Sequence, residues 1–256
     1  MTTEAPHDHV CLAYDDPATL EENARAFLTA GSRSGQRIWY IGPAGPPVGV
    51  PARHLRLDTT YAEGSAVDPR EQAAVFIGAF HDALADGHRG LRVVAEVTPL
   101  VRTAAQREAF CRYEHLIDRF MAVHPLSGMC AFRRSALGAG DLDELACLHP
   151  TTNVAVPFRM HACRPELGRA TLSGELDLAS EDALRRTLER TGLHRERGGV
   201  VLDATGLRFA DHRALQRLDR WATDHDTTLV LRASGDGLGR LAALLELDRL
   251  RVEVAR

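Results

Sequence analysis

The stretch Leu91-Arg-Val-Val-Ala-Glu-Val97 is short and almost continuously apolar. A run of this kind is typical of a strand that is buried on both faces of a parallel sheet. Comparable short apolar runs lie on either side of it along the chain, at His9–Tyr14, Arg37–Ile41 and Met129–Phe132. We therefore expect these four runs to form the strands of one buried sheet.

Longer segments with helical periodicity separate these runs. Asp16-Pro17 supplies an N-cap and a proline at the first helical position, and Gly31 is placed to end that helix. An alternation of strands with helices predicts an α/β domain whose sheet is mainly parallel and covered on both faces. A short strand around His54–Leu57 and further helices beginning at Pro69 and covering Thr103–Val123 and Leu142–Leu148 complete the predicted domain.

A second block begins after Thr151–Pro157, a segment with two threonines, an asparagine and a proline. We place the boundary near residues 155–165, which gives a first domain over 1–158 and a second, smaller α/β sandwich over 165–256. A chain of 256 residues has the length of two ordinary domains. The elements expected in the second domain are strands at Arg169–Ser173, Gly199–Ala204, Thr228–Ala233 and Arg251–Val254, and helices at Glu181–Thr191, His212–Asp224 and Gly237–Leu247.

Composition limits the chemistry. The net charge is -4, so no overall positive field favours a nucleic-acid partner. All 31 basic residues are arginine, which excludes a Schiff-base lysine and the lysine of a phosphate-binding loop. The five cysteines are widely spaced and form no CxxC pair, as expected for reduced thiols. The polar N-terminus and the lack of a long apolar run predict a cytoplasmic protein that neither crosses nor binds a membrane.

The second half carries Leu172-Ser-Gly-Glu-Leu-Asp-Leu178 and Val200-Val-Leu-Asp-Ala-Thr-Gly-Leu-Arg-Phe209, followed by Asp211. These segments resemble STAS domains, the fold of anti-sigma factor antagonists. The resemblance implies a partner-binding edge built from a strand, a loop and a helix, and a partner that is an anti-sigma factor or a related kinase-fold protein. In this reading Phe209 is an apolar plug in the loop, and Asp211 caps the next helix. The partner-binding residues it implies are Asp177, Asp203, Thr205, Asp211, His212 and Arg213.

The sequence departs from the STAS pattern directly after Asp211. His212 and Arg213 stand where the family carries a serine that partner kinases phosphorylate. A phosphate acts as a switch there because it adds nearly two negative charges to a docking surface. Thr205 is a nearby hydroxyl, but it matches a structural Ser/Thr of the family. We therefore expect partner binding without phosphoregulation, with His212 either a pH-sensitive or phospho-accepting group or an exposed polar residue.

The first half carries a series of short motifs in a fixed order: His9-Val-Cys-Leu-Ala-Tyr14, Gly31…Gly35-Gln-Arg, Arg92-Val-Val-Ala-Glu96, Tyr113-Glu114, Met129-Cys130-Ala-Phe132 and His149-Pro150. These motifs resemble the MEDS family of methanogen/methylotroph DcmR-type sensory domains. Phe132 stands where tyrosine is commoner in the family. The resemblance implies a degenerate RecA-like fold that binds a small molecule. The loop Gly42–Gly49 lacks lysine and contains three prolines, so we expect no ATP hydrolysis and no enzymatic activity.

Two interpretations remain for the polar residues of the first half. In the first, a ligand pocket is lined by Glu96, Glu114, Tyr14 and His9; in the second, the two carboxylates form salt bridges with Arg92 or Arg112. The cysteines also allow two interpretations. Either Cys11 and Cys130 are small buried hydrophobes on neighbouring strands and His149 ends a helix, or a metal is bound by His9, Cys11, Cys130 and His149. The leading hypothesis is a two-domain switch in which a sensed ligand alters partner binding; the alternative is a thiol or metal sensor. The ligand, any cofactor, the identity of the partner and the oligomeric state are not given by the sequence.

Overall fold

The computed structural model describes residues 8–61, 66–193 and 199–255. The chain divides into two compact units, Met1–Ala155 and Val156–Arg256. The division falls at the start of the boundary region expected from the sequence. Residues 156–164 therefore belong to the second unit, where Phe158–Ala162 form a strand.

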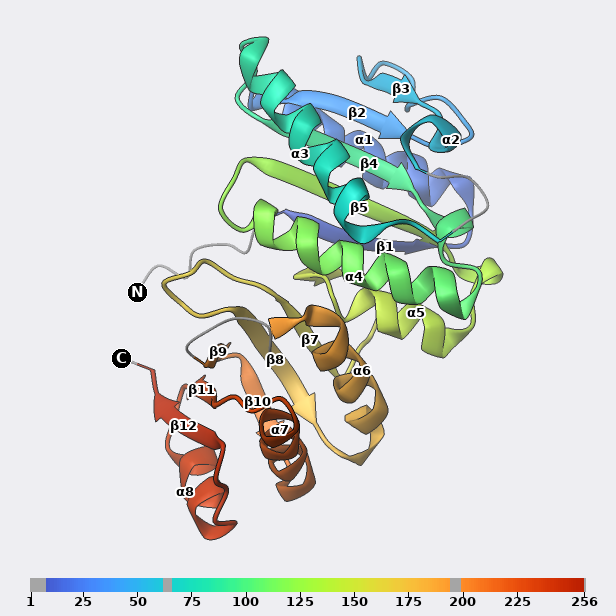
Figure 1. The fold of residues 1–256 in the computed structure, drawn as a ribbon. Helices are drawn as coiled ribbons and strands as arrows, with labels where there is room; N and C mark the ends of the chain where they lie inside the picture. Colours follow the sequence, from blue (N-terminus) through green and yellow to red (C-terminus); the bar gives the residue numbers. More distant parts are fainter. Residues whose placement is uncertain (1–7, 62–65, 194–198, 256) are drawn as a thin grey trace. The chain divides into compact units, whose positions relative to one another are not determined.

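The first unit is built on one six-stranded sheet in the order β3-β2-β4-β5-β1-β6, and every pair of neighbours is parallel (Figure 1). The predicted parallel α/β architecture is thus confirmed for this unit. Its strands are β1 (His9–Tyr14), β2 (Arg37–Ile41), β3 (Arg53–Leu55), β4 (Leu91–Glu96), β5 (Leu126–Arg133) and β6 (Thr151–Thr152). Its helices are α1 (Pro17–Arg33), α2 (Leu57–Thr60), α3 (Pro69–Ala85), α4 (Ala104–Met121) and α5 (Ala139–Ala146), with 3₁₀ turns η1 (Thr98–Leu100) and η2 (Arg134–Ala136).

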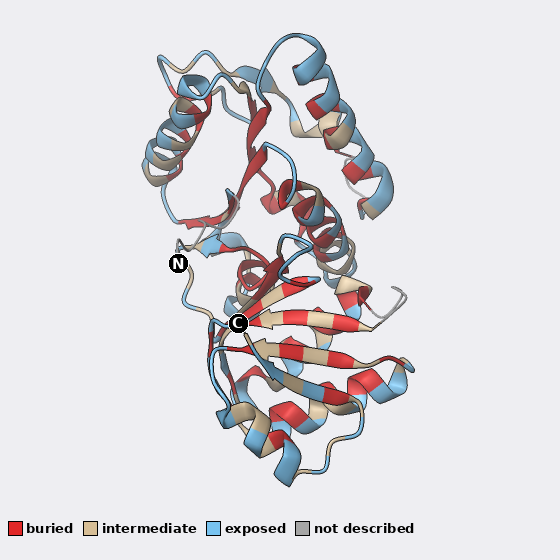
Figure 2. Ribbon diagram, turned by 90° about the vertical axis from the view of Figure 1, so that its left-hand side faces the viewer, coloured by how far each residue is buried: buried red, intermediate tan, exposed pale blue. Residues whose placement is uncertain are grey.

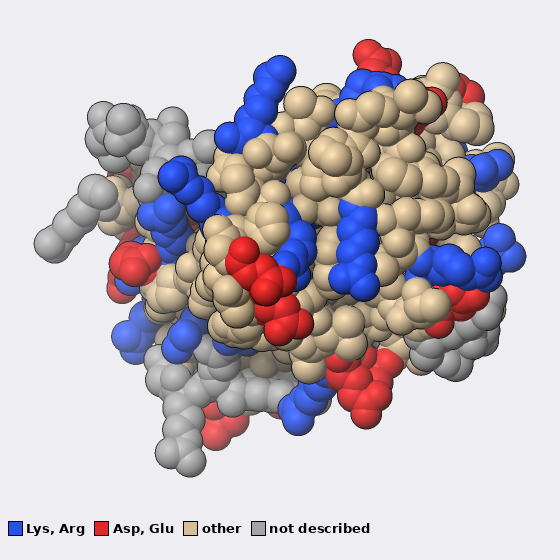
Figure 3. Space-filling model, turned by 90° about the horizontal axis from the view of Figure 1, so that it is seen from above, with Lys and Arg blue, Asp and Glu red and all other residues tan. Residues whose placement is uncertain are grey.

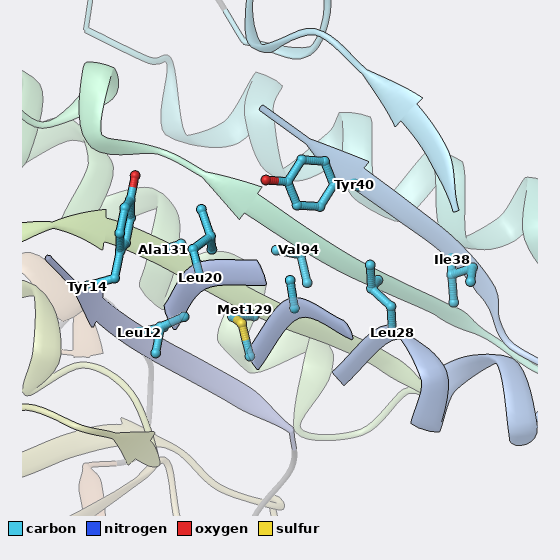
Figure 4. Close-up of a cluster of buried hydrophobic side chains, with 10 residues drawn as sticks. Leu12, Tyr14, Leu20, Leu28, Ile38, Tyr40, Val94, Met129 and Ala131 are labelled. Atoms are coloured by element: carbon cyan, nitrogen blue, oxygen red, sulfur yellow. The ribbon is translucent and has the colours of Figure 1, made fainter. Parts of the chain in front are cut away.

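Helices cover both faces of this sheet. Helix α1 packs on one face, while α3 and α4 pack against each other on the opposite face (Figure 1). The α1 face is closed by an apolar cluster in which Leu20 and Leu28 of the helix meet Tyr14, Tyr40 and Val94 of the strands (Figure 4). Residues on alternate positions of each strand point to opposite faces. The two faces therefore offer two separate environments for polar side chains.

Two local expectations for this unit were wrong. Gly31 does not end the first helix, which continues to Arg33 and is followed by Gly35 at a φ of 73°. Gly31 is instead a contact point, because a Cβ there would lie 2.6 Å from the Arg92 side chain. Leu57, expected in a strand, begins the short helix α2.

The second unit holds the other sheet, in the order β10-β8-β9-β11-β12, with β7 pairing antiparallel to β8. The remaining pairs are parallel, so this unit is also α/β. Its strands are β7 (Phe158–Ala162), β8 (Ala170–Leu176), β9 (Val200–Ala204), β10 (Leu207–Ala210), β11 (Leu229–Ala233) and β12 (Leu250–Val254). Its helices are α6 (Glu181–Thr191), α7 (His212–Asp224) and α8 (Gly237–Leu244), and η3 (Leu178–Ser180) is a 3₁₀ turn.

The two sheets differ in how their strands are buried (Figure 2). All six residues of β4 are buried, including Arg92 and Glu96. Strands β9 and β11 alternate between buried and half-buried positions. Alternation of this kind indicates a sheet with one face packed on a core and the other face partly accessible.

Phe209 also departs from its expected place. It lies within strand β10, beside Glu175 of β8, and its side chain is 51% exposed. It is therefore an exposed apolar residue at the edge of the sheet and not a plug in a loop.

On the face drawn in Figure 3, arginine and acidic side chains are interspersed. Within the described ranges, no helix is both long enough and apolar enough to span a bilayer.

Candidate functional site

Strand β1 sends its polar residues to two different faces of the first sheet. His9 and Cys11 are two residues apart and share the face that α4 covers, whereas Tyr14 belongs to the cluster under α1. The ligand pocket expected from the sequence combined His9 and Tyr14, which lie on opposite faces of the sheet. Each face therefore carries its own group of polar residues.

A cluster of ionisable residues lies on the α4 face, where four side chains from four elements converge. His9 comes from β1, Glu114 from α4, Cys130 from β5 and His149 from the segment after α5. One potential ligand atom from each of the four lies within 4.8 Å of all the others. His9 Nε2 is 2.9 Å and His149 Nε2 3.3 Å from Glu114 Oε2, and the Cys130 thiol donates to Glu114 Oε1 at 3.4 Å. We call these four residues the His/Glu/Cys cluster.

The fold places each member for a local reason. Glu114 lies on the apolar side of α4, beside Tyr113 and Ile117, so its carboxylate turns toward the sheet and only 1% of the residue is exposed. The register between β1 and β5 puts His9 opposite Gly128 and Cys11 opposite Cys130. Glycine at position 128 lets the end of α4 lie close over β5, because a Cβ there would lie 2.9 Å from Met121 Cε. The same Cβ would make only an ordinary contact of 3.6 Å with His9 Cδ2.

Each imidazole of the cluster is held by a second hydrogen bond. His9 Nδ1 bonds Asp118 Oδ1 at 2.8 Å, and both side chains are 1% exposed. His149 Nδ1 bonds the Leu145 carbonyl oxygen at 2.9 Å. A hydrogen bond at Nδ1 fixes the orientation of the ring and leaves Nε2 as the atom that faces the centre of the cluster. The two rings lie with their centroids 4.2 Å apart.

The electrostatics of the cluster are strongly perturbed. Burial by itself disfavours the charged imidazolium, but the bonds to Asp118 and Glu114 outweigh it and raise the pKa of His9 from 6.5 to about 10. Burial likewise opposes the Glu114 carboxylate, yet His149 and His9 lower its pKa to about 2. Burial and the Glu114 charge raise the pKa of the Cys130 thiol well above its usual value. The cluster on its own therefore holds charged His9 and Glu114 with a neutral thiol.

Cys11 stands apart from this group. It is fully buried on β1, and burial raises the pKa of its thiol to about 12. Three residues of the metal set considered from the sequence, His9, Cys130 and His149, do come together. Glu114 takes the fourth place in the cluster, and Cys11 is not among the donors within 4.8 Å of one another in the part of the chain that the structure describes.

Glu96 and Tyr14 form a separate polar contact on the α1 face. The Tyr14 hydroxyl donates to Glu96 Oε1 at 3.2 Å, and Thr98 Oγ1 donates to the same oxygen. The two arginines considered as partners of Glu96 and Glu114 pair with other carboxylates. Arg92 pairs with Asp8, and Arg112 pairs with Glu108.

Two of the hollows in the described part of the first unit differ widely in size. A cavity of about 20 Å³ lies against His9, Glu114 and Cys130, which is room for a single water-sized occupant. A larger pocket of about 280 Å³ opens where β2 and β4 end, and its lining includes Gly42, Arg56, Asp58, Tyr61 and Leu100. Ligands of parallel α/β sheets bind outside the carboxyl ends of the strands. Tyr61 lines both hollows.

The residues expected at the partner edge act as local caps. Asp177 accepts from the Ala179 and Ser180 amides, Asp203 accepts from the Thr205 amide and hydroxyl, and Asp211 accepts from the Ala214 amide at 2.7 Å. His212 and Arg213 are exposed at the start of α7. Asp177 and Asp211 follow the ends of β8 and β10, and Asp203 is the last residue but one of β9. The structure therefore gathers these groups along one edge of the second sheet.

Sequence reasoning missed Asp118 and Tyr61. Asp118 had a readable signal, because it follows Glu114 by four residues and lies on the same helix face as Ile117 and Met121. Two carboxylates on the apolar face of one helix require buried partners. Tyr61 offered no comparable signal, because its role depends on the packing of α2 and α3.

The first unit belongs to the parallel α/β domains, a class in which ligands are commonly bound at the carboxyl ends of the strands. The comparison with protein families names this class more closely. The MEDS family model (MEthanogen/methylotroph, DcmR Sensory domain) matches residues 8–150, and the chain belongs to this family. The match covers the sheet, the His/Glu/Cys cluster and the pocket, so the first unit is a sensory domain. Comparisons with curated proteins and with solved structures gave no match.

Proposed function

We propose that the protein is a cytoplasmic signalling protein, without enzymatic activity, in which the first unit senses a signal and the second binds a regulatory partner. The observation that carries the sensory part is the enclosed His/Glu/Cys cluster inside a sensory-family domain. Four buried ionisable groups are costly to bring together. Such a cluster is reasonable in a sensory domain if the signal changes the charge of these four groups or binds to them.

The pocket at the strand ends is the place we assign to a small organic ligand. Its volume of about 280 Å³ is near the lower end for small-molecule sites, whereas the cavity at the cluster admits no organic molecule. Arg56 and Asp58 give this pocket polar groups of both signs. An all-parallel sheet with a pocket at this edge also supports the RecA-like relationship, and the absence of lysine argues against nucleotide hydrolysis.

Tyr61 is the contact through which pocket and cluster could influence each other. It lines both hollows and packs edge-on against Tyr113, the neighbour of Glu114 in α4, with ring centroids 6.4 Å apart. A ligand that moves Tyr61 would change the packing beside Glu114. Such coupling needs a ligand with different affinities for the two packings.

The second unit supports a STAS-like role at the edge formed by β10 and the start of α7. Phe209 is 51% exposed there, and Leu178, just after β8, is 60% exposed. Exposed apolar side chains flanked by capping carboxylates make a surface suited to protein binding. We assign this edge to an anti-sigma factor or a related kinase-fold protein. His212 and Arg213 give it no hydroxyl at the position of the family's switch serine.

Direct binding tests the partner assignment. The purified full-length chain is titrated against each purified anti-sigma-like, kinase-fold protein encoded by the same genome. We expect one of them to bind with micromolar or tighter affinity. Phe209→Ser should weaken this complex at least about tenfold, as expected for the loss of an aromatic anchor.

Leu244→Ser is the matched control for this experiment. Leu244 is 81% exposed at the end of α8, so the change removes an exposed apolar side chain of the same unit away from the proposed edge. It should leave binding unchanged. Binding by none of the candidates, or equal weakening by the two variants, contradicts the proposal.

A further inference from the structure

We propose that the His/Glu/Cys cluster is a binding site for one zinc ion, held by His9 Nε2, Glu114 Oε2, Cys130 Sγ and His149 Nε2. This inference deepens the sensory role proposed above by naming a chemical class of signal. It depends on the geometry of the first unit alone and not on the partner of the second.

The spacing of the donors fits a tetrahedral ion. Metal–donor bonds of 2.0–2.3 Å place the corners of a tetrahedron roughly 3.3–3.8 Å apart. Around Glu114 Oε2 the two imidazole nitrogens lie at 2.9 and 3.3 Å, and all four donors lie within 4.8 Å of one another. Side-chain shifts of well under 1 Å for the nitrogens, and of about 1 Å for the most distant donors, would close this arrangement around one ion.

The hydrogen-bond partners of His9 Nδ1 and His149 Nδ1 are of the kinds found in metal sites. Metal-bound histidines generally donate their other ring nitrogen to a carboxylate or a backbone carbonyl. Asp118 supplies the carboxylate for His9, and Leu145 supplies the carbonyl for His149. In both rings the outer bond is made at Nδ1, so Nε2 points inward. These supports come from α4 and α5, which differ from the strands that carry His9 and Cys130.

The centre of the cluster is closed to solvent, because His149 and Glu114 are 0% and 1% exposed. His149 Nε2 lies 3.3 Å and His9 Nε2 2.9 Å from the same oxygen, Glu114 Oε2. Two imidazole nitrogens thus converge on one carboxylate oxygen inside the domain, as donors do around a shared cation.

The donor types select among metals. One thiolate and two imidazoles suit zinc, whereas magnesium and calcium require oxygen ligands. A cavity of about 20 Å³ beside the cluster accommodates an ion or a water and no organic molecule. Four protein donors also fill a tetrahedral shell, which is typical of a structural or regulatory zinc and not of a catalytic one.

Zinc binding to the full-length protein tests this proposal. Metal-stripped protein is titrated with Zn²⁺ in competition with a chromophoric chelator. We expect one zinc per chain with an affinity tighter than micromolar. Cys130→Ala should weaken binding at least about 100-fold, since it removes a direct ligand.

Cys11→Ala is the matched control, because Cys11 and Cys130 are both buried and face each other in register on neighbouring strands. It should bind zinc as the parent does. No binding by the parent protein, or equal binding by the Cys130 and Cys11 variants, overturns the proposal.

A spectroscopic measurement on the unmodified protein covers the case in which a variant fails to fold. Replacement of zinc by Co²⁺ should give a near-ultraviolet sulfur-to-cobalt charge-transfer band and the intense visible bands of a tetrahedral ion. Cobalt bound without the sulfur band contradicts the assignment of Cys130. Neither result changes the partner titration of the second unit, so the two proposals fail separately.

Discussion

The two sheets of this protein show how burial decides where ionisable groups can be used. In the first unit every residue of β4 is buried, and the sheet has helices on both faces. In the second unit β9 and β11 are buried only at alternate positions. The first unit therefore holds His9, Glu114 and Asp118 in its interior, whereas the second holds its aspartates as helix and turn caps at an edge.

The difference separates two kinds of function. Charges enclosed between sheet and helix interact strongly, because little water screens them, and they shift one another's pKa. Capping carboxylates at an accessible edge stabilise their own turns and remain available to a partner. The first arrangement suits detection of an ion or a proton, and the second suits protein binding.

Removal of Glu114 should have the largest effect on stability. Glu114→Ala removes the carboxylate that contacts His9 Nε2 and the Cys130 thiol, and leaves charged His9 with Asp118 as its remaining carboxylate partner. Loss of one member of a buried pair costs about 3–5 kcal/mol. Urea unfolding of metal-free protein should show this loss in the transition of the first unit.

The matched change in the second unit is Glu175→Ala, which removes an exposed partner of Arg208 at 3.2 Å. Exposed ion pairs contribute about 0–1 kcal/mol. If Glu114→Ala and Glu175→Ala lowered the free energy of unfolding by similar amounts, burial would not distinguish the carboxylates of the two sheets.

The pH dependence of the metal-free protein should be the next largest effect. The pKa of His9 is raised from 6.5 to about 10, so its contribution to stability is complete below pH 6.5 and is lost as the pH rises toward 10. The pKa of Glu114 is lowered from 4.5 to about 2, so its contribution is complete above pH 4.5 and is lost as the pH falls toward 2.

These two groups predict maximal stability of the metal-free first unit between about pH 4.5 and 6.5. Thermal unfolding across this range should follow that profile. Glu114→Gln should remove the acid limb attributed to Glu114, and an unchanged profile in this variant would assign the limb to other carboxylates.

A smaller effect, on zinc affinity, is expected from Asp118, which bonds His9 Nδ1. Asp118→Asn keeps the size of the side chain but removes the charge that orients the imidazole. Loss of such a supporting group weakens metal binding about 10–100-fold. Zinc competition should show this decrease with a stoichiometry that stays at one, and an unchanged affinity would show that Asp118 does not position His9 for the metal.

In the second unit, loss of a cap should cost about 1 kcal/mol. Asp211 accepts from the Ala214 amide at 2.7 Å and begins α7. Replacement of an N-cap aspartate by alanine costs about 0.5–2 kcal/mol. Urea unfolding of Asp211→Ala should show the loss in the transition of the second unit, with the first unit unchanged. Serine at this position should restore most of it.

The smallest effect is expected beside that cap. His212 is exposed at the first position of α7, so His212→Ala should change the free energy of unfolding by less than about 0.5 kcal/mol. Partner affinity measured across pH 5.5–8 should also be unchanged if His212 has no regulatory role. A pH-dependent affinity that the variant abolishes would instead make His212 a switch.

The sequence predicted the fold better than the site. Apolar runs such as Leu91–Val97 and caps such as Asp16 and Asp211 act locally, and the strands and helices they predict are present. The sequence did not predict β6, β7 or β10, which are strands of two to five residues held by pairing with β1 or β8.

The site depends on contacts between distant segments. His9, Cys130 and His149 could be nominated by residue type, but the choice of Glu114 over Cys11 follows from how α4 lies across the sheet. The alternation of β1 also places Tyr14 on the opposite face from His9, which a list of polar residues does not reveal. Asp118 was recognisable in principle from its four-residue spacing to Glu114.

X-ray absorption at the zinc edge, on the full-length protein loaded with one zinc, tests the proposed zinc site directly. We expect one sulfur at about 2.3 Å and three nitrogen or oxygen ligands at about 2.0–2.1 Å, the shell that Cys130, His9, His149 and Glu114 supply. A shell without sulfur, or one with two or more sulfurs, would contradict it.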